Sequence, residues 1–168
     1  MIKITLPDGS VKEFASGVTP MEVAKSISEG FARNVISASF NGTTVETTTP
    51  LTTDGSLILY TWNDEDGKKA FWHSTSHVMA QVLEQMYPGI KLTLGPALAN
   101  GFYYDVDFEE HKITEADFKK IEDRVLEISR GKHEFKLRPV SKADALELYK
   151  DNVYKTEMIT NLEDGTIT

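Results

Sequence analysis

The sequence predicts an α+β fold in two parts, a small domain over residues 1–62 and a larger one over residues 70–168. Short runs of alternating apolar and polar residues, separated by turn signals, fill the first part and predict strands. Longer helical repeats of apolar residues mark the second part. Between the two, residues 63–69 are polar and charged and contain glycine, a composition typical of a linker. A length of 168 residues accommodates two such domains.

Five strands are predicted in the first part. Asn41 and Gly42 form a strong signal for a two-residue hairpin turn, and the run from Pro7 to Gly9 predicts another turn. Alternating apolar and polar residues flank these turns and define the strands. They cover residues 2–6, 11–14, 35–40, 43–46 and 56–60.

One helix is predicted between the second and third of these strands. Thr19 and Glu22 have the spacing of a capping box, in which each side chain accepts a backbone N–H of the other residue, and Pro20 occupies the first helical position. Gly30 is expected to end the helix. Two strands, a helix and three more strands form a small β-grasp (ubiquitin-like) domain, with the helix on a single face of the sheet.

The second part predicts a mixture of helices and strands. Apolar residues at three- and four-residue spacing predict a helix over 71–87, which Pro88 ends. Thr114 and Asp117 begin a second helix with another capping box, Gly131 ends it, and Ser141 caps a third. The predicted strands cover 90–94, 102–108, 133–140 and 153–159, and residues 161–168 look like part of a hairpin.

Composition narrows the chemistry that is open to this chain. It has 18 Lys and Arg against 26 Asp and Glu, a net charge of −8, which argues against bulk electrostatic binding of nucleic acid. It has no cysteine, which excludes a disulfide, a thiolate nucleophile and a cysteine-based metal site in this chain. We find neither a signal-peptide pattern nor an apolar stretch of membrane length, and expect a soluble, cytoplasmic protein without membrane contact.

His73 and His77 form the most informative pair of residues. Histidines four positions apart on a helix converge on one point, which suits a metal ion or a shared substrate. A zinc peptidase needs Glu directly after the first His, where Ser74 stands, and two His leave a zinc site two ligands short. We therefore expect no metal site. A purely structural pair, each His bonding a backbone carbonyl, is an equally open interpretation of the residues alone.

A second group of candidates lies on the strand predicted at 102–108. Alternate side chains of a strand point to opposite faces, so that Tyr103 or Tyr104 lines a cleft while its neighbour packs against the fold. Asp105, Asp107 and Glu109 share one face. Such a row could bind a metal ion, but a solvated strand edge explains it better.

Four motifs, in this order, resemble the threonyl-tRNA synthetase family. Residues 1–61 resemble its TGS domain, a β-grasp module, and residues from 69 onward resemble its editing domain, which is related to that of alanyl-tRNA synthetase. The resemblance covers essentially the whole chain. The motifs are His73-Ser74-x-x-His77, Leu94-Gly95-Pro96, Asn100-Gly101-Phe102-Tyr103-Tyr104-Asp105 and Tyr154-Lys155.

The resemblance implies hydrolytic editing, the removal of serine wrongly attached to tRNA(Thr). A pocket sized for threonine rejects serine by only ~1–3 kcal/mol per methylene, so a second, hydrolytic site is needed. By the resemblance, His73 binds the terminal ribose and aligns water, His77 shapes the pocket, and Lys155 stabilises the negative charge that develops in the transition state. Tyr104 and Asp105 are expected to form walls of the pocket that contact substrate.

The resemblance also implies that parts of the family's machinery lie outside this chain. The family completes its editing pocket with a downstream Asp-x-Cys…His segment, so we expect a second domain truncated at its C-terminal end. No cofactor is expected in this chain; ATP, magnesium and zinc belong to the ligase core of a homodimeric parent whose partner is tRNA(Thr). Two alternatives are a non-catalytic TGS-type module that binds tRNA and a metal-dependent trans-editing hydrolase of the alanyl type.

Overall fold

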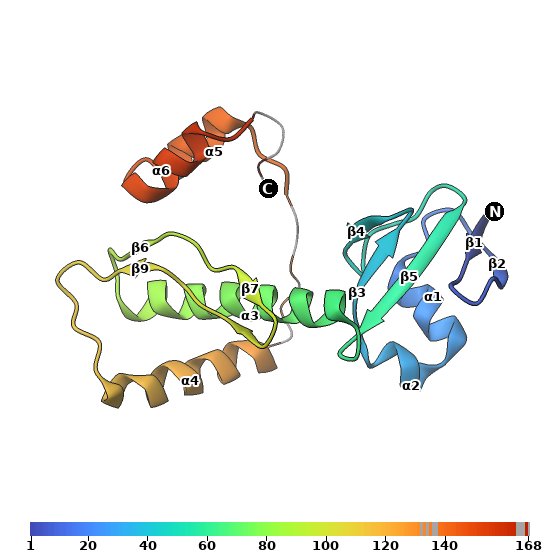
Figure 1. Cartoon of the computed structure of the whole chain (residues 1–168), viewed down its shortest axis with the longest axis horizontal. Coiled ribbons are helices and arrows are strands. Elements are labelled where there is room, and N and C mark those ends of the chain that lie inside the picture. The colour runs from blue at the N-terminus through green and yellow to red at the C-terminus, as the bar shows by residue number, and fades with distance from the viewer. Residues whose placement is uncertain (132, 134, 136–137, 164–166, 168) are drawn as a thin grey trace. The chain divides into compact units, whose positions relative to one another are not determined.

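The computed structural model describes residues 1–131, 133, 135, 138–163 and 167 (Figure 1). These residues form two compact units, Met1–Trp72 with Ala97–Gly101, and His73–Pro96 with Phe102–Thr168. The strand predicted over 133–140 and the hairpin predicted over 161–168 fall partly on residues outside the described part of the chain.

The first unit contains a five-stranded mixed sheet with the order β2-β1-β5-β3-β4. Strands β1 and β5 pair in parallel, and the other neighbours pair antiparallel. Asn41 and Gly42 have φ angles of 51° and 81°, as the predicted two-residue turn between β3 and β4 requires. All five predicted strands are confirmed, with these bounds: β1 Ile2–Thr5, β2 Val11–Phe14, β3 Val35–Phe40, β4 Thr43–Val45 and β5 Gly55–Thr61.

Helix α1, Pro20–Ile27, begins with the predicted capping box, since Thr19 and Glu22 bond each other's backbone N–H groups at 2.8 and 3.2 Å. The prediction that Gly30 ends this helix is wrong. The Ser28 hydroxyl accepts the N–H of Phe31 and caps a second short helix, α2, Glu29–Ala32, and Gly30 lies inside α2. The sheet and α1 enclose a core of Ile2, Ile4, Leu6, Val23, Ala38, Leu51 and Leu57, the arrangement expected of a β-grasp domain.

Helix α3, Glu65–Met86, is longer than the predicted helix and includes residues 65–69, whose composition predicted a linker. Asp64 accepts the backbone N–H of Thr61 at 2.7 Å, and its own carbonyl accepts the N–H of Lys68 at 3.0 Å, so the chain passes from β5 almost directly into the helix. Gly67 is buried against the Thr61 carbonyl, where a side chain has no room. Although α3 has 22 residues, neither it nor any other described helix is apolar enough to span a bilayer.

The strands that follow α3 are shorter than predicted. Strand β6, Lys91–Leu92, pairs antiparallel with β9, Val106–Asp107, and β7, Ala97–Leu98, pairs with β8, Gly101–Phe102. Two backbone hydrogen bonds beyond β6 and β9, from Thr93 to Asp105 at 3.0 Å and from Asp105 to Leu94 at 2.8 Å, extend that pairing. The predicted strands at 90–94 and 102–108 therefore exist as short ladders rather than as full strands.

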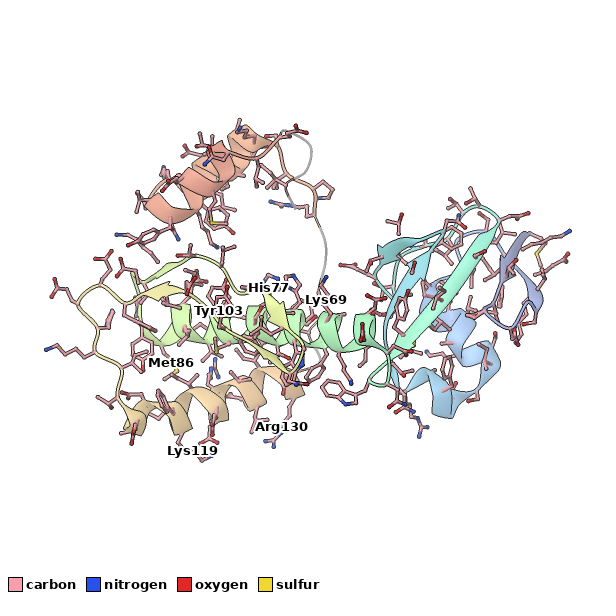
Figure 2. All side chains as sticks on the ribbon, in the orientation of Figure 1. Lys69, His77, Met86, Tyr103, Lys119 and Arg130 are labelled. Atoms are coloured by element: carbon pink, nitrogen blue, oxygen red, sulfur yellow. The ribbon has the colours of Figure 1, made fainter. Side chains whose placement is uncertain are left out.

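Three further helices complete the second unit: α4 Glu115–Arg130, α5 Lys142–Leu148 and α6 Val153–Thr160. The capping box of Thr114 and Asp117 begins α4 as predicted, and Arg124 of α4 donates to Gln85 of α3 at 3.1 Å. Figure 2 shows Met86 on the side of α3 that faces α4.

The strand predicted over 153–159 is wrong, because this segment forms α6. The Asn152 side chain accepts the N–H of Lys155 at 3.1 Å and so caps the helix. The β-branched residues of the segment favour strands only weakly and in the right packing context, and here the N-cap and the helical hydrogen bonds prevail.

Candidate active site

His73 and His77 lie one turn apart on α3 and meet as predicted. Their Nε2 atoms are 3.1 Å apart, and their rings are in edge-to-face contact with centroids at 4.6 Å. One ring nitrogen of the pair donates while the other accepts. His77 points to the side of α3 opposite Met86, away from α4 (Figure 2). The helix therefore presents two imidazoles to a single point, as a shared substrate or water molecule requires.

The environment of His77 favours its neutral form. Its ring is in edge-to-face contact with that of His73, and the centroid of the Phe135 ring lies 6.5 Å away. Partial burial lowers the pKa of His77 below 6.5, and the charges of His73 and Lys155 lower it further. At neutral pH the imidazole is uncharged and can accept a proton.

Ser76 and Tyr104 contact the loop that lies beside the histidine helix. Ser76, 1% exposed, lies one residue before His77, and its hydroxyl contacts the carbonyl oxygens of His73 at 2.7 Å and Gly95 at 3.0 Å. The Tyr104 ring lies against Gly95 so closely that a Cβ there would overlap it. The motif around Gly95 is thus placed beside the histidine helix. Ser76 was not singled out by the sequence; its place between the two histidines, on the buried side of the helix, was the available signal.

Tyr103, Tyr104 and Asp105 alternate as predicted. Tyr103 is 48% exposed, whereas Tyr104 is partly buried and burial raises its pKa, so that it is a neutral phenol. Asp105 is fixed by its backbone bonds to Thr93 and Leu94, and the residue is exposed. Tyr104 therefore lies beside the loop that contacts the histidine helix, while Asp105 is on the open side of the same segment.

Lys155 lies near the start of α6. Its ammonium lies 4.1 Å from the centroid of the Tyr149 ring, a cation–π contact, and its charge is close enough to lower the pKa of His77. Sequence reasoning missed two residues that contact Lys155. The Tyr149 ring contacts its ammonium group, and the Asn152 side chain accepts its backbone N–H. The helix-cap pattern would have indicated Asn152, had the segment not been interpreted as a strand.

Metal ligands are scarce around this site. Among the residues that the structure describes, three or more His, Cys, Asp or Glu side chains nowhere gather into a group that could hold a metal ion. The histidine pair offers two ligands, and Asp107, one of the three acidic residues noted on the strand, accepts a hydrogen bond from Tyr154 at 2.7 Å.

Comparison with known proteins adds two findings to this geometry. The TGS domain family matches residues 2–61. The threonine–tRNA ligases of Flavobacterium johnsoniae, Flavobacterium psychrophilum and Parabacteroides distasonis are 84%, 82% and 51% identical to this chain, over 100% of its length and 26% of theirs. The chain is homologous to the N-terminal region of threonine–tRNA ligases.

The residues matched by the TGS family coincide with the five-stranded β-grasp sheet and its helix α1. The candidate site lies outside the TGS match but inside the region that is similar to the ligases. Its residues are His73, His77, Tyr104 and Lys155. The chain spans about a quarter of the length of the curated relatives it matches, 26% in each of the three.

Proposed function

We propose that this chain is the N-terminal region of a ligase that attaches threonine to tRNA(Thr) with ATP, and that its second unit hydrolyses mischarged Ser-tRNA(Thr). The similarity to threonine–tRNA ligases supports the first part of the proposal. The second part rests on one observation above all, the two imidazole Nε2 atoms 3.1 Å apart with a lysine charge nearby.

Editing requires chemistry that this arrangement can supply. Serine lacks one methyl group of threonine, and a binding pocket alone discriminates by only ~1–3 kcal/mol per such group. A second site that excludes threonine sterically needs an oriented water molecule and a means to stabilise negative charge, but no strong nucleophile. Two imidazoles, of which that of His77 is uncharged, and an ammonium group meet these needs.

In the proposed mechanism, His73 binds the ribose of the terminal adenosine and aligns the attacking water. His77, which is neutral at pH 7, shapes the pocket and supports His73 through their direct contact. The Lys155 ammonium stabilises the oxyanion that forms as water adds to the ester carbonyl. Tyr104 and Asp105 form pocket walls on the substrate side.

The first unit contributes tRNA contact in this proposal. With a net charge of −8 the chain binds tRNA weakly by itself, and binding weakens further as salt increases. The proposed domains are 1–62 and 70–168, with a boundary within 63–69. The proposal for the parent ligase includes ATP, magnesium and zinc in its core, a homodimer and a cytoplasmic location, all of which rest on the resemblance to the ligases.

The test is deacylation of Ser-tRNA(Thr), measured for the chain alone and for a full-length ligase that carries it. We expect hydrolysis by the full-length protein and its loss in His73→Ala. His111→Ala is the matched control, because His111 bonds the Pro88 carbonyl just beyond the C-terminal end of α3, away from the histidine pair. The chain alone is expected to be weakly active or inactive.

Either of two results would refute the proposal and favour another function. Full activity in His73→Ala would leave the histidines structural and make the chain a non-catalytic tRNA-binding module. Stoichiometric zinc, with activity lost on chelation, would indicate a metal-dependent hydrolase of the alanyl type.

A further inference from the structure

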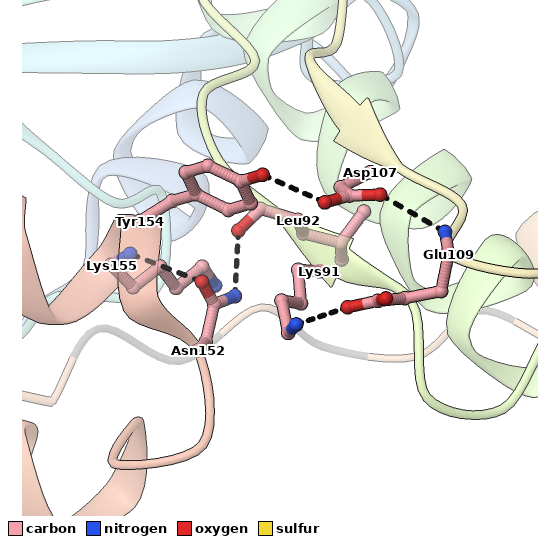
Figure 3. Close-up of polar contacts among 7 residues, drawn as sticks. All are labelled: Lys91, Leu92, Asp107, Glu109, Asn152, Tyr154 and Lys155. Atoms are coloured by element: carbon pink, nitrogen blue, oxygen red, sulfur yellow. Dashed lines mark hydrogen bonds and ion pairs between the residues drawn. The ribbon is translucent and has the colours of Figure 1, made fainter.

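A polar cluster attaches the start of α6 to the short ladder of β6 and β9 (Figure 3). The Asn152 amide uses both of its ends. Its Nδ2 donates to the Leu92 carbonyl of β6 at 2.8 Å, and its Oδ1 accepts the backbone N–H of Lys155 at 3.1 Å. A single side chain thus caps the helix and bonds it to a strand 60 positions earlier in the chain.

A second contact lies beside the first. The Tyr154 hydroxyl donates to Asp107 of β9 at 2.7 Å, and the same carboxylate accepts the N–H of Glu109 at 3.0 Å. Lys91 of β6 pairs with Glu109 and adds a third polar link within the ladder (Figure 3). The hydrogen bond from Tyr154 lowers the pKa of Asp107, so the acceptor is an ionised carboxylate and the bond is charge-assisted.

Both contacts lie just before Lys155 in the chain: Asn152 is three positions earlier and Tyr154 is one position earlier. Helix α6 has eight residues, of which only Ile159 is buried, so apolar packing holds it weakly. Its place relative to the ladder therefore depends on hydrogen bonds that are directional. The same ladder continues through Leu94 and Asp105 to the loop that lies beside the histidine helix.

We infer that Asn152 is a positioning residue, which anchors α6 to β6 and so fixes the position of the Lys155 ammonium. Tyr154 supports it as the second attachment through Asp107. The consequence for catalysis rests on the proposed function, but the position of the ammonium does not. Loss of the anchor leaves Lys155 in a helix that is free to shift, even where the helix itself still forms.

Asn152→Ser separates the two tasks of this side chain. Serine is as good an N-cap as asparagine and adds no charge, so α6 keeps its start. Its hydroxyl is too short to reach the Leu92 carbonyl as well, so the anchor is lost. Asn161→Ser is the matched control, because it makes the same exchange at the C-cap of the same helix.

The readout is the pKa of His77, followed by NMR titration of its ring proton in the full chain. Lys155→Met is expected to raise this pKa toward 6.5, because one nearby positive charge is removed while desolvation and His73 remain. Asn152→Ser is expected to raise it in the same direction, and Asn161→Ser to leave it unchanged. In Asn152→Ser combined with Lys155→Met, the shift should equal that of Lys155→Met alone, since both act through one charge.

An unchanged His77 pKa in Asn152→Ser would overturn the inference, as would a further shift in the double variant. If Asn152→Ser does not fold, Tyr154→Phe is tested in its place, because this variant loses only the hydroxyl that bonds Asp107. Tyr154→Phe should raise the pKa of His77 by a smaller amount than Asn152→Ser. An unchanged pKa of His77 would again contradict the anchor. In a full-length ligase that deacylates Ser-tRNA(Thr), Asn152→Ser should lower kcat by up to about 100-fold with KM little altered. Absence of deacylation in the wild type would refute the proposed function. The titration of His77 would still test whether Asn152 anchors α6.

Discussion

Replacing Gly95 with alanine tests whether the loop beside the histidine helix is seated as described. An alanine Cβ at this position would lie 3.1 Å from Cγ of Tyr104 and closer still to its Cδ2 and Cε2. Carbon atoms attract one another best at about 3.5–4.0 Å, so the ring must move away. Tyr104 is partly buried, so the move disturbs the packing of the second unit.

The expected cost is that of overpacking, about 1–3 kcal/mol. In a domain of 60–100 residues, each kcal/mol lowers the unfolding midpoint by about 4–8 °C. We therefore expect the second unit to melt at least ~4 °C lower. The proposed function further predicts that deacylation by the full-length ligase falls, because the Gly95 carbonyl accepts a hydrogen bond from the Ser76 hydroxyl, one residue before His77.

Calorimetry measures this midpoint, and tryptophan fluorescence identifies the unit that melts. Both tryptophans, Trp62 and Trp72, lie in the first unit, so their transition should be unchanged in Gly95→Ala. Gly30→Ala is the control, since a Cβ there meets only Ser28 Oγ at 3.9 Å and alanine favours the helix. A Gly95→Ala protein that melts with the wild type would refute the close contact between Gly95 and Tyr104.

Three further predictions concern other parts of the chain. Thr19→Ala removes half of the capping box of α1 and should destabilise the TGS domain by about 1 kcal/mol in urea denaturation followed by tryptophan fluorescence; an unchanged midpoint would contradict the role of the cap. Gly67→Ala places a Cβ 2.8 Å from the Thr61 carbonyl carbon and closer to its oxygen, and should cost about 1–3 kcal/mol in the same assay, whereas a neutral result would argue against a helix starting at Glu65. Because desolvation lowers the pKa of His77 below 6.5, its contribution to stability is complete above that pH and is lost as the pH falls; His77→Gln should therefore unfold with less pH dependence between pH 7 and 5, and an identical dependence would show that His77 is not desolvated.

Patterns of residues close in sequence predicted most of the β-grasp domain. They failed to predict elements that depend on contacts between residues further apart. The capping box of Thr19 and the turn at Asn41 involve residues close in sequence, and both occur as expected. Residues 65–69 have the composition of a linker, but the close approach of Gly67 to Thr61 makes them the first turns of α3. Composition carries no information about such an approach.

The candidate site divides in the same way. A spacing of four residues on a helix is enough to bring His73 and His77 together, because helical geometry alone fixes their relative position. The position of Lys155 is different. It depends on Asn152 bonding Leu92 across 60 residues and on the Tyr149 ring, and the β-branched residues around it predicted a strand instead of α6.

The sequence by itself therefore determined the elements with local hydrogen-bond and turn chemistry, the histidine pair and the similarity to threonine–tRNA ligases. The tertiary structure alone decided that the loop at Gly95, in contact with Ser76 and Tyr104, lies beside the histidine helix and that the charge of Lys155 acts on His77. The physical reason is that contacts between segments far apart in sequence depend on how the elements pack, and no short stretch of residues encodes that packing.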